Sequence, residues 1–90
     1  MEFEWDEEKN RANILKHKVS FGRAAQIFKN PVFTKVDQRQ DYGETRFVSI
    51  GSVGDECLVV VHTLRGPKVR IISAWKGGQD ERSKLSQLYS

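Results

Sequence analysis

The feature that most constrains the fold is an apolar run in the second half of the chain, Cys57-Leu58-Val59-Val60-Val61. Side chains alternate between the two faces of a sheet, so a strand that is apolar at every position has both faces covered. We therefore expect a central strand over residues 57–61. The run contains Cys57, the only cysteine of the chain, and this position predicts a buried, inert thiol.

Three other segments after residue 31 have the composition of strands and are separated by glycine, proline or polar residues. They are residues 32–36, 46–50 and 68–75. We expect a turn at residues 51–55, and Arg65-Gly66-Pro67 predicts a tight turn before the last strand. Strands joined by such short connections form an antiparallel meander.

Two helices are expected before the meander. Asp6 is placed to cap the first, which runs to about Lys18. The apolar side of this helix is short and consists of Ile14 and Leu15.

The second helix has the clearest amphipathic spacing of the chain. Ser20 is placed to cap it, and Asn30-Pro31 ends it because the residue before a proline avoids the helical region. Its apolar residues follow the spacing i, i+3, i+4 and i+7, and they are Phe21, Ala24, Ala25 and Phe28.

The two ends of the chain complete the predicted fold. Residues 3–5 alternate and predict a short edge strand, with Trp5 as its anchor in the core. Gly77-Gly78 ends the last strand, and Asp80 is expected to cap a short terminal helix that carries Leu85. The result is one α+β domain over residues 1–90, with the order β-α-α-β-β-β-β-α and an antiparallel sheet packed by helices.

Composition and charge limit the class of protein. With 38% hydrophobic and 30% charged residues the chain has the composition of a folded domain, and its net charge of +3 favours polyanions mildly. The N-terminus lacks the basic start and apolar stretch of a signal peptide, and no apolar run reaches the length of a membrane span. We therefore expect a cytoplasmic protein that does not bind a membrane.

No motif of a known catalytic class is present. With two histidines and one cysteine a zinc site is not expected, and neither a metal nor a cofactor is predicted. An enzyme without either depends on positive charge and proton transfer. Cleavage of RNA through its own 2′-hydroxyl is such a reaction, because the substrate supplies the nucleophile.

The first helix carries a polar ridge on the side away from its apolar residues. Lys9, Asn13 and Lys16 recur at i, i+4 and i+7, and His17 borders them. In one interpretation the ridge contacts phosphates, with Lys9 as its best candidate. The alternative is a solvated face whose last cations interact with the helix dipole.

His62 and Trp75 are candidates on the sheet. His62 follows the valine run and is a natural proton carrier, although a half-buried structural histidine is the commoner case. Trp75 could stack a base beside Lys76, although a core or interface tryptophan is again the commoner case.

The arginines of the meander are the remaining candidates. Arg70 lies inside a strand, Arg46 lies on another strand, and Arg65 lies at a turn, which together predict a basic stripe across the sheet. The alternative is that they form ion pairs. The acidic residues available for these pairs are Asp37, Asp41 and Glu44.

Four stretches, none of them specific alone, occur in an order typical of one family. They are Trp5-Asp6-Glu7-Glu8-Lys9, Asn13-Ile14-Leu15-Lys16-His17, Asp41-Tyr42-Gly43-Glu44-Thr45-Arg46 and Val69-Arg70-Ile71-Ile72-Ser73-Ala74. On these stretches the chain resembles the BrnT family of ribonuclease toxins over nearly its whole length.

The resemblance implies a RelE-like fold, metal-independent RNA cleavage that inhibits translation, and neutralisation by a BrnA-like antitoxin. Such an antitoxin carries a ribbon-helix-helix part, and only the complex of toxin and antitoxin would contact DNA. The catalytic candidates are then Lys9, His62, Arg65 and Arg70, and the RNA-binding candidates are Lys16, Arg46, Trp75 and Lys76.

The chain departs from the family pattern at two positions. The family continues Ile-Ser-Ala with a basic residue and then Lys-Ala, whereas here Trp75 takes the basic place and Gly77 the alanine. The departure implies a weaker nuclease or a site that stacks a base. Two alternatives therefore stay open: a non-catalytic nucleic-acid-binding module, and a subunit derived from a toxin that only binds its antitoxin.

Overall fold

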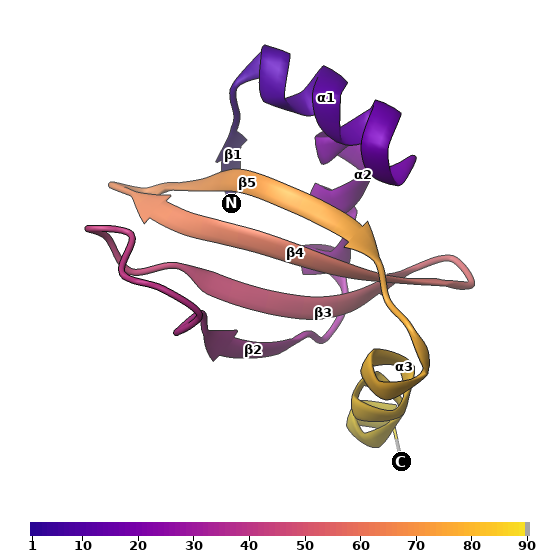
Figure 1. Ribbon diagram of the computed structural model, residues 1–90. Coiled ribbons are helices and arrows are strands. Elements are labelled where there is room, and N and C mark those ends of the chain that lie inside the picture. The colour runs from indigo at the N-terminus through magenta and orange to yellow at the C-terminus, as the bar shows by residue number, and fades with distance from the viewer. Residues whose placement is uncertain (90) are drawn as a thin grey trace.

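A computed structural model describes residues 1–89 and shows a five-stranded sheet with helices on both faces (Figure 1). The elements in chain order are β1 (Glu2–Glu4), α1 (Glu7–His17), α2 (Phe21–Ala25), the 3-10 helix η1 (Gln26–Lys29), β2 (Phe33–Val36), β3 (Phe47–Val53), β4 (Glu56–Arg65), β5 (Lys68–Lys76), α3 (Gln79–Ser86) and the 3-10 helix η2 (Gln87–Tyr89). The predicted α+β class and the order of the elements are confirmed.

The strand order is β1-β5-β4-β3-β2. Strands β2 to β5 form the expected antiparallel meander, and β1 adds to its edge as a parallel strand against residues 68–70. The apolar run lies in β4, between β3 and β5, and the prediction of a central strand is confirmed. Gly54 and Gly66, with φ of 59° each, supply the left-handed conformation that the two tight turns of the meander require.

The turn predicted over residues 51–55 is wrong in its extent, because β3 continues to Val53. Gly51 lies inside the strand, where a Cβ atom would come 2.6 Å from the Cβ of Ile27. The glycine therefore serves the close packing of η1 on the sheet. The sequence alone could not distinguish this use of glycine from a turn.

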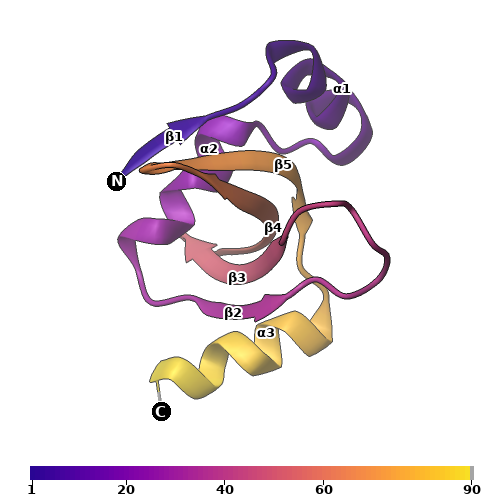
Figure 2. The same ribbon diagram turned by 90° about the vertical axis from the view of Figure 1, so that its left-hand side faces the viewer.

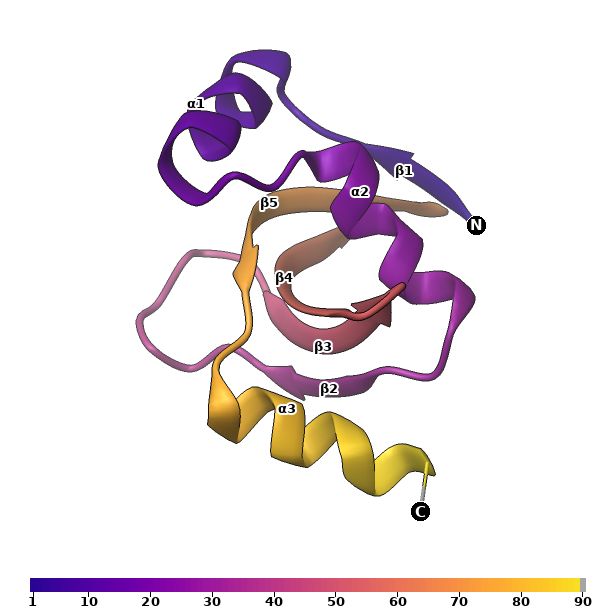
Figure 3. The same cartoon turned by 90° about the vertical axis from the view of Figure 1, so that its right-hand side faces the viewer.

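The main core lies between the sheet and the layer formed by α2 and η1 (Figures 2 and 3). Phe21 and Ile27 from this layer pack on Leu58, Val60 and Ile71, and all five are almost completely buried. Ser20 caps α2 as expected, since its hydroxyl accepts a hydrogen bond from the backbone N–H of Arg23. Trp5 anchors the N-terminal strand against Phe21, with ring centroids 6.3 Å apart.

The opposite face of the sheet is covered only in part, by α3 (Figure 1). Leu85 of this helix packs with Ile50, Cys57 and Val59. Cys57 is buried as predicted, and burial raises the pKa of its thiol. A Cβ atom at Gly77 would lie 2.7 Å from the Sγ atom of Cys57, so this glycine leaves room for the cysteine.

The capping residue predicted for α3 is wrong. The helix begins at Gln79 with Gly78 as its N-cap, and Asp80 lies in the first turn. Glu81 stabilises this start by accepting a hydrogen bond from the backbone N–H of Gly78, at 2.7 Å. No helix in the described part of the chain has the length and apolar character needed to cross a membrane.

Helix α1 is oriented differently from the sequence-based prediction. Asp6 caps it as expected, but Ile14 and Leu15 are 38% and 76% exposed, and the side chains that the helix buries are Asn10 and Asn13. The prediction of an apolar inner side and a polar outer ridge that includes Asn13 is therefore wrong. The helix is attached to the sheet by amide hydrogen bonds.

Asn13 forms the central contact of this attachment. Because β1 pairs only with residues 68–70, the rest of the outer edge of β5 is left open, and the Asn13 amide binds it like a neighbouring strand. Its Nδ2 donates to the carbonyl of Ala74 at 2.8 Å and to that of Val19 at 2.9 Å, and its Oδ1 accepts from the N–H of Ala74 at 3.3 Å. Asn10 adds a bond from the N–H of Phe21 to its Oδ1, at 2.8 Å.

Substitutions on α1 test this orientation. Asn13→Ala leaves three buried backbone groups without partners and should lower the free energy of unfolding by about 2–4 kcal/mol. Leu15→Ala removes an exposed side chain and should change it by less than about 0.5 kcal/mol. Urea unfolding followed by circular dichroism measures both values. A larger loss for Leu15→Ala than for Asn13→Ala would contradict the observed orientation of the helix.

Candidate functional site

Two adjoining hollows lie on the sheet face opposite α2 and η1. The first, which we call the basic hollow, measures about 690 Å³ and lies between the C-terminal end of α1, the loop 37–46 and strands β4 and β5. Its polar lining residues are Lys16, His17, Arg39, Arg46, Ser73 and Lys76, and its apolar ones are Val61, Ile72 and Trp75. Of the described residues that line it, none carries a carboxylate, so a bound anion meets only positive or neutral groups.

Helix α1 contributes Lys16 and His17 from its last turn. The helix ends because Lys18 adopts a left-handed conformation, with φ of 62°. Asn13, one turn earlier, fixes this end of the helix against β5, and the His17 ring consequently lies 6.1 Å from the Trp75 ring between centroids. The buried amide therefore places an imidazole and an ammonium group at the rim of the basic hollow.

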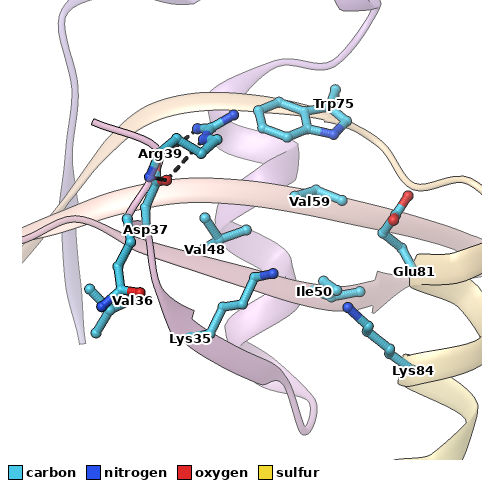
Figure 4. Close-up of a pocket in the computed structure, with 11 residues that line it drawn as sticks. Lys35, Val36, Asp37, Arg39, Val48, Ile50, Val59, Trp75, Glu81 and Lys84 are labelled. Atoms are coloured by element: carbon cyan, nitrogen blue, oxygen red, sulfur yellow. Dashed lines mark hydrogen bonds and ion pairs between the residues drawn. The ribbon is translucent and has the colours of Figure 1, made fainter.

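The loop 37–46 contributes Arg39, and a buried carboxylate positions it. Asp37 is 6% exposed and accepts hydrogen bonds from Nε and Nη2 of Arg39, both at 2.8 Å (Figure 4). It also accepts one from the hydroxyl of Tyr42 at 3.1 Å. These bonds, led by the one from Arg39, hold the pKa of Asp37 well below its usual range. The carboxylate thus stays ionised, and the guanidinium lies 5.8 Å from the centre of the Trp75 ring.

Arg46 is the last residue of the same loop, and two side chains hold its guanidinium group. Its guanidinium lies over the Tyr42 ring, 4.1 Å from the ring centre, and its Nε donates to Glu44 at 3.2 Å. Glu44 also pairs with Arg65 at 3.3 Å, and the hydrogen bond from Arg46 is the main reason why the pKa of Glu44 is lowered. One aromatic and one acidic partner therefore hold Arg46 in one orientation.

The structure brings together the four RNA-binding candidates of the sequence analysis. Lys16, Arg46, Trp75 and Lys76 all line the basic hollow, although they come from three separate parts of the chain. Lys76 also forms an ion pair with Glu56 at 3.5 Å, and this pair lowers the pKa of Glu56 less than the hydrogen bond from Arg23 does.

All four catalytic candidates lie outside the two hollows. Lys9 is exposed in the first turn of α1, about 12 Å along the helix axis from His17. Arg70 donates to Glu4 of the neighbouring strand at 2.7 Å, and Arg65 pairs with Glu44. Both arginines thus form ion pairs, as the alternative expected, but only Arg65 pairs with one of the expected acids, and Arg70 pairs with Glu4 instead.

The fourth candidate, His62, faces the helices. It is 6% exposed, packs between the rings of Phe28 and Phe47, and shares a hydrogen bond of 2.8 Å between its Nε2 and the hydroxyl of Ser49. Among the described residues its Nδ1 has no hydrogen-bond partner, and burial lowers its pKa to about 4. This position speaks against a role as proton carrier for a substrate on the sheet surface.

Sequence reasoning did not select His17 or Arg39. His17 was noted only as a neighbour of the α1 ridge, and Arg39 lies in a polar loop without periodicity. The pattern Asp37-x-Arg39 contains a signal in retrospect, because an acid and an arginine two residues apart can pair across a turn. In the described part of the chain no group of three or more His, Cys, Asp or Glu side chains is placed to hold a metal ion.

The fold and the two hollows define a small α+β domain that presents cations, an imidazole and an indole on one face of its sheet, a combination suited to a nucleic acid. Comparison with protein families assigns the chain more closely. Residues 5–81 match the family described as ribonuclease toxin, BrnT, of type II toxin-antitoxin system. The chain therefore belongs to the BrnT family of ribonuclease toxins. A search of curated proteins found no match.

The buried position of His62 predicts a pH-dependent stability. Its pKa is about 4 in the folded chain and near 6.5 in the unfolded chain, so the unfolded chain binds more protons between these values and stability falls as the pH is lowered. Between pH 7 and pH 5 the loss should be about 2 kcal/mol, measured by urea unfolding. His62→Gln should remove most of this loss, whereas His17→Gln should retain it. An unchanged pH profile in His62→Gln would show that the histidine is not buried in its neutral form.

Proposed function

We propose that this member of the BrnT family is a metal-independent endoribonuclease whose active site is the basic hollow. The observation that supports this most directly is the grouping of four cations with one imidazole and one indole around a single hollow. Positive charge can bind the phosphate, the imidazole can move a proton, and the indole can stack on a base.

In the proposed reaction RNA supplies its own nucleophile. His17 removes the proton of a 2′-hydroxyl, and the 2′-oxygen then forms a bond to the adjacent phosphorus. The bond between phosphorus and the 5′-oxygen breaks, and the leaving oxygen takes a proton from an ammonium group of the hollow. The products are a 2′,3′-cyclic phosphate and a 5′-hydroxyl, with the same total of protons as the reactants.

The two arginines of the hollow stabilise the charge that develops on the phosphate. Arg46 is preorganised because the Tyr42 ring and Glu44 hold it before substrate binds, and Arg39 is preorganised by Asp37. Guanidinium groups suit this role since their planar donors match two phosphate oxygens at once. We assign no chemical step to Lys9, His62, Arg65 or Arg70.

The family also implies an antitoxin, and we propose that it is a BrnA-like protein with a ribbon-helix-helix part. Its toxin-binding segment should place acidic side chains in the basic hollow and an apolar anchor on Trp75, since covering the hollow excludes RNA. Contact with DNA then occurs through the antitoxin. RNA cleavage by the free toxin in the cytoplasm would inhibit translation.

One observation favours a second candidate function. Trp75 lines the basic hollow on the side shared with the adjoining hollow, at the place for which the resemblance implies a basic residue. A chain that has lost a phosphate-binding cation could bind RNA or its antitoxin without cleaving RNA. The nature of the RNA products distinguishes this candidate from the nuclease.

The test is a digestion of end-labelled single-stranded RNA in the presence of EDTA. The wild type should produce 2′,3′-cyclic phosphate ends. A DNA strand of the corresponding sequence, which lacks the 2′-hydroxyl nucleophile, should stay intact. His17→Gln and Arg46→Gln should lower the rate by about 100-fold, since each removes a group needed in the transition state.

Arg70→Gln is the matched control for Arg46→Gln. It removes the same charge from the sheet but lies outside the hollow, so its cleavage rate should stay within about threefold of the wild type. Intact RNA with the wild-type protein would favour the binding subunit. Equal losses for Arg46→Gln and Arg70→Gln would show that the basic hollow is not the active site.

A further inference from the structure

The second hollow, which we call the side hollow, adjoins the basic hollow and shares Arg39 and Trp75 with it. It measures about 450 Å³, within the size range of small-molecule sites, and α3 and β2 form its far walls. A polymer whose phosphate lies in the basic hollow can therefore place an adjoining group in the side hollow without leaving the surface.

The floor of the side hollow is apolar. Val48 and Ile50 of β3 and Val59 of β4 form it, and the Trp75 ring stands at its edge (Figure 4). Ile50 and Val59 are almost completely buried where α3 packs, so the floor is rigid, and the half-buried Val48 and Trp75 form the part of it that a ligand can reach. Such a surface fits the face of an aromatic ring and offers no partner to a phosphate.

The rim of the side hollow is polar and carries both signs of charge. Lys35 and Lys84 direct ammonium groups over the floor, and the carboxylate of Glu81 lies on the side of Trp75 (Figure 4). Glu81 is oriented by the hydrogen bond that its Oε1 accepts from Gly78. Asp37 also lines the hollow, but its oxygens are already engaged by Arg39 and Tyr42.

We propose that the side hollow binds one unpaired keto nucleobase of RNA, guanine or uracil, next to the phosphate in the basic hollow. This inference rests on the proposed function. Guanine and uracil each present a carbonyl oxygen beside a ring N–H, which complements an ammonium donor from Lys84 and a carboxylate acceptor from Glu81. Held in the same orientation by the phosphate in the basic hollow, adenine and cytosine would present an amino group to Lys84 and a bare ring nitrogen to Glu81, and both pairs are of the wrong type.

The proposal makes the protein specific for single-stranded RNA. The edge of the base that meets Lys84 and Glu81 is the edge used in base pairing. The base must also unstack from the adjacent bases of its strand before its face can lie on the floor of the side hollow. A base in a duplex satisfies neither condition.

Binding of uncleavable RNA tests the proposal separately from catalysis. The probes are short 2′-O-methyl oligonucleotides that differ only in one central base. Binding is followed at two salt concentrations by the change in tryptophan fluorescence, to which Trp75 at the hollow contributes. The wild type should bind the guanine and uracil probes about tenfold more tightly than the adenine and cytosine probes, and a duplex probe more weakly still.

Two variants with the same change of charge separate the hollows. Lys84 lines only the side hollow, so Lys84→Gln should abolish the preference for keto bases. Lys76 lines only the basic hollow, so Lys76→Gln should weaken the binding of all probes alike and retain the preference for keto bases. Cleavage of natural RNA without base preference, or equal effects of the two variants, would overturn the inference and leave the proposed function standing. Failure of every probe to bind and of RNA to be cut would overturn both.

Discussion

The hydrogen bonds between the Asn13 amide and the backbone of Ala74 fix helix α1 on the outer edge of the sheet, along β5. The parallel strand β1 covers only the first part of β5, and the remaining edge of the sheet needs partners for its backbone groups. A helix cannot extend a sheet, but one amide side chain can supply a donor and an acceptor at the right spacing. With that contact made, the last turn of α1 brings Lys16 and His17 to the rim of the basic hollow.

A second buried polar group, the carboxylate of Asp37, organises the other wall of the hollow. A loop of ten residues between β2 and β3 has no regular structure of its own, and a buried charge is costly unless its partners are fixed. Arg39 and Tyr42 satisfy this charge, and the Tyr42 ring in turn carries Arg46. The cations of the hollow are therefore positioned by geometry, which distinguishes a site from a merely basic surface.

The sequence predicted the parts of the fold that depend on apolar patterning and on caps. The valine run placed β4 in the sheet, and Asp6 and Ser20 marked the starts of two helices, because these signals are local. The orientation of α1 was not predictable, since its buried side is polar and a buried asparagine has the same sequence pattern as an exposed one. The choice of His62 over His17 has a related cause. The sequence shows that His62 follows an apolar run in a strand, but it does not show that the His62 side chain points into the core.

The central claim is that positioned cations, and not net positive charge, bind RNA in this protein. Asp37→Asn tests it most directly, because this variant adds one positive charge while releasing Arg39, and Asp41→Asn adds the same charge in the same loop while its side chain can still accept the N–H of Gly43. The measurement is the affinity of both variants for a 2′-O-methyl RNA, with the fold checked by circular dichroism. We predict about tenfold weaker binding for Asp37→Asn and unchanged or slightly tighter binding for Asp41→Asn. Tighter binding by both variants would contradict the account, because it would show that charge alone controls the interaction.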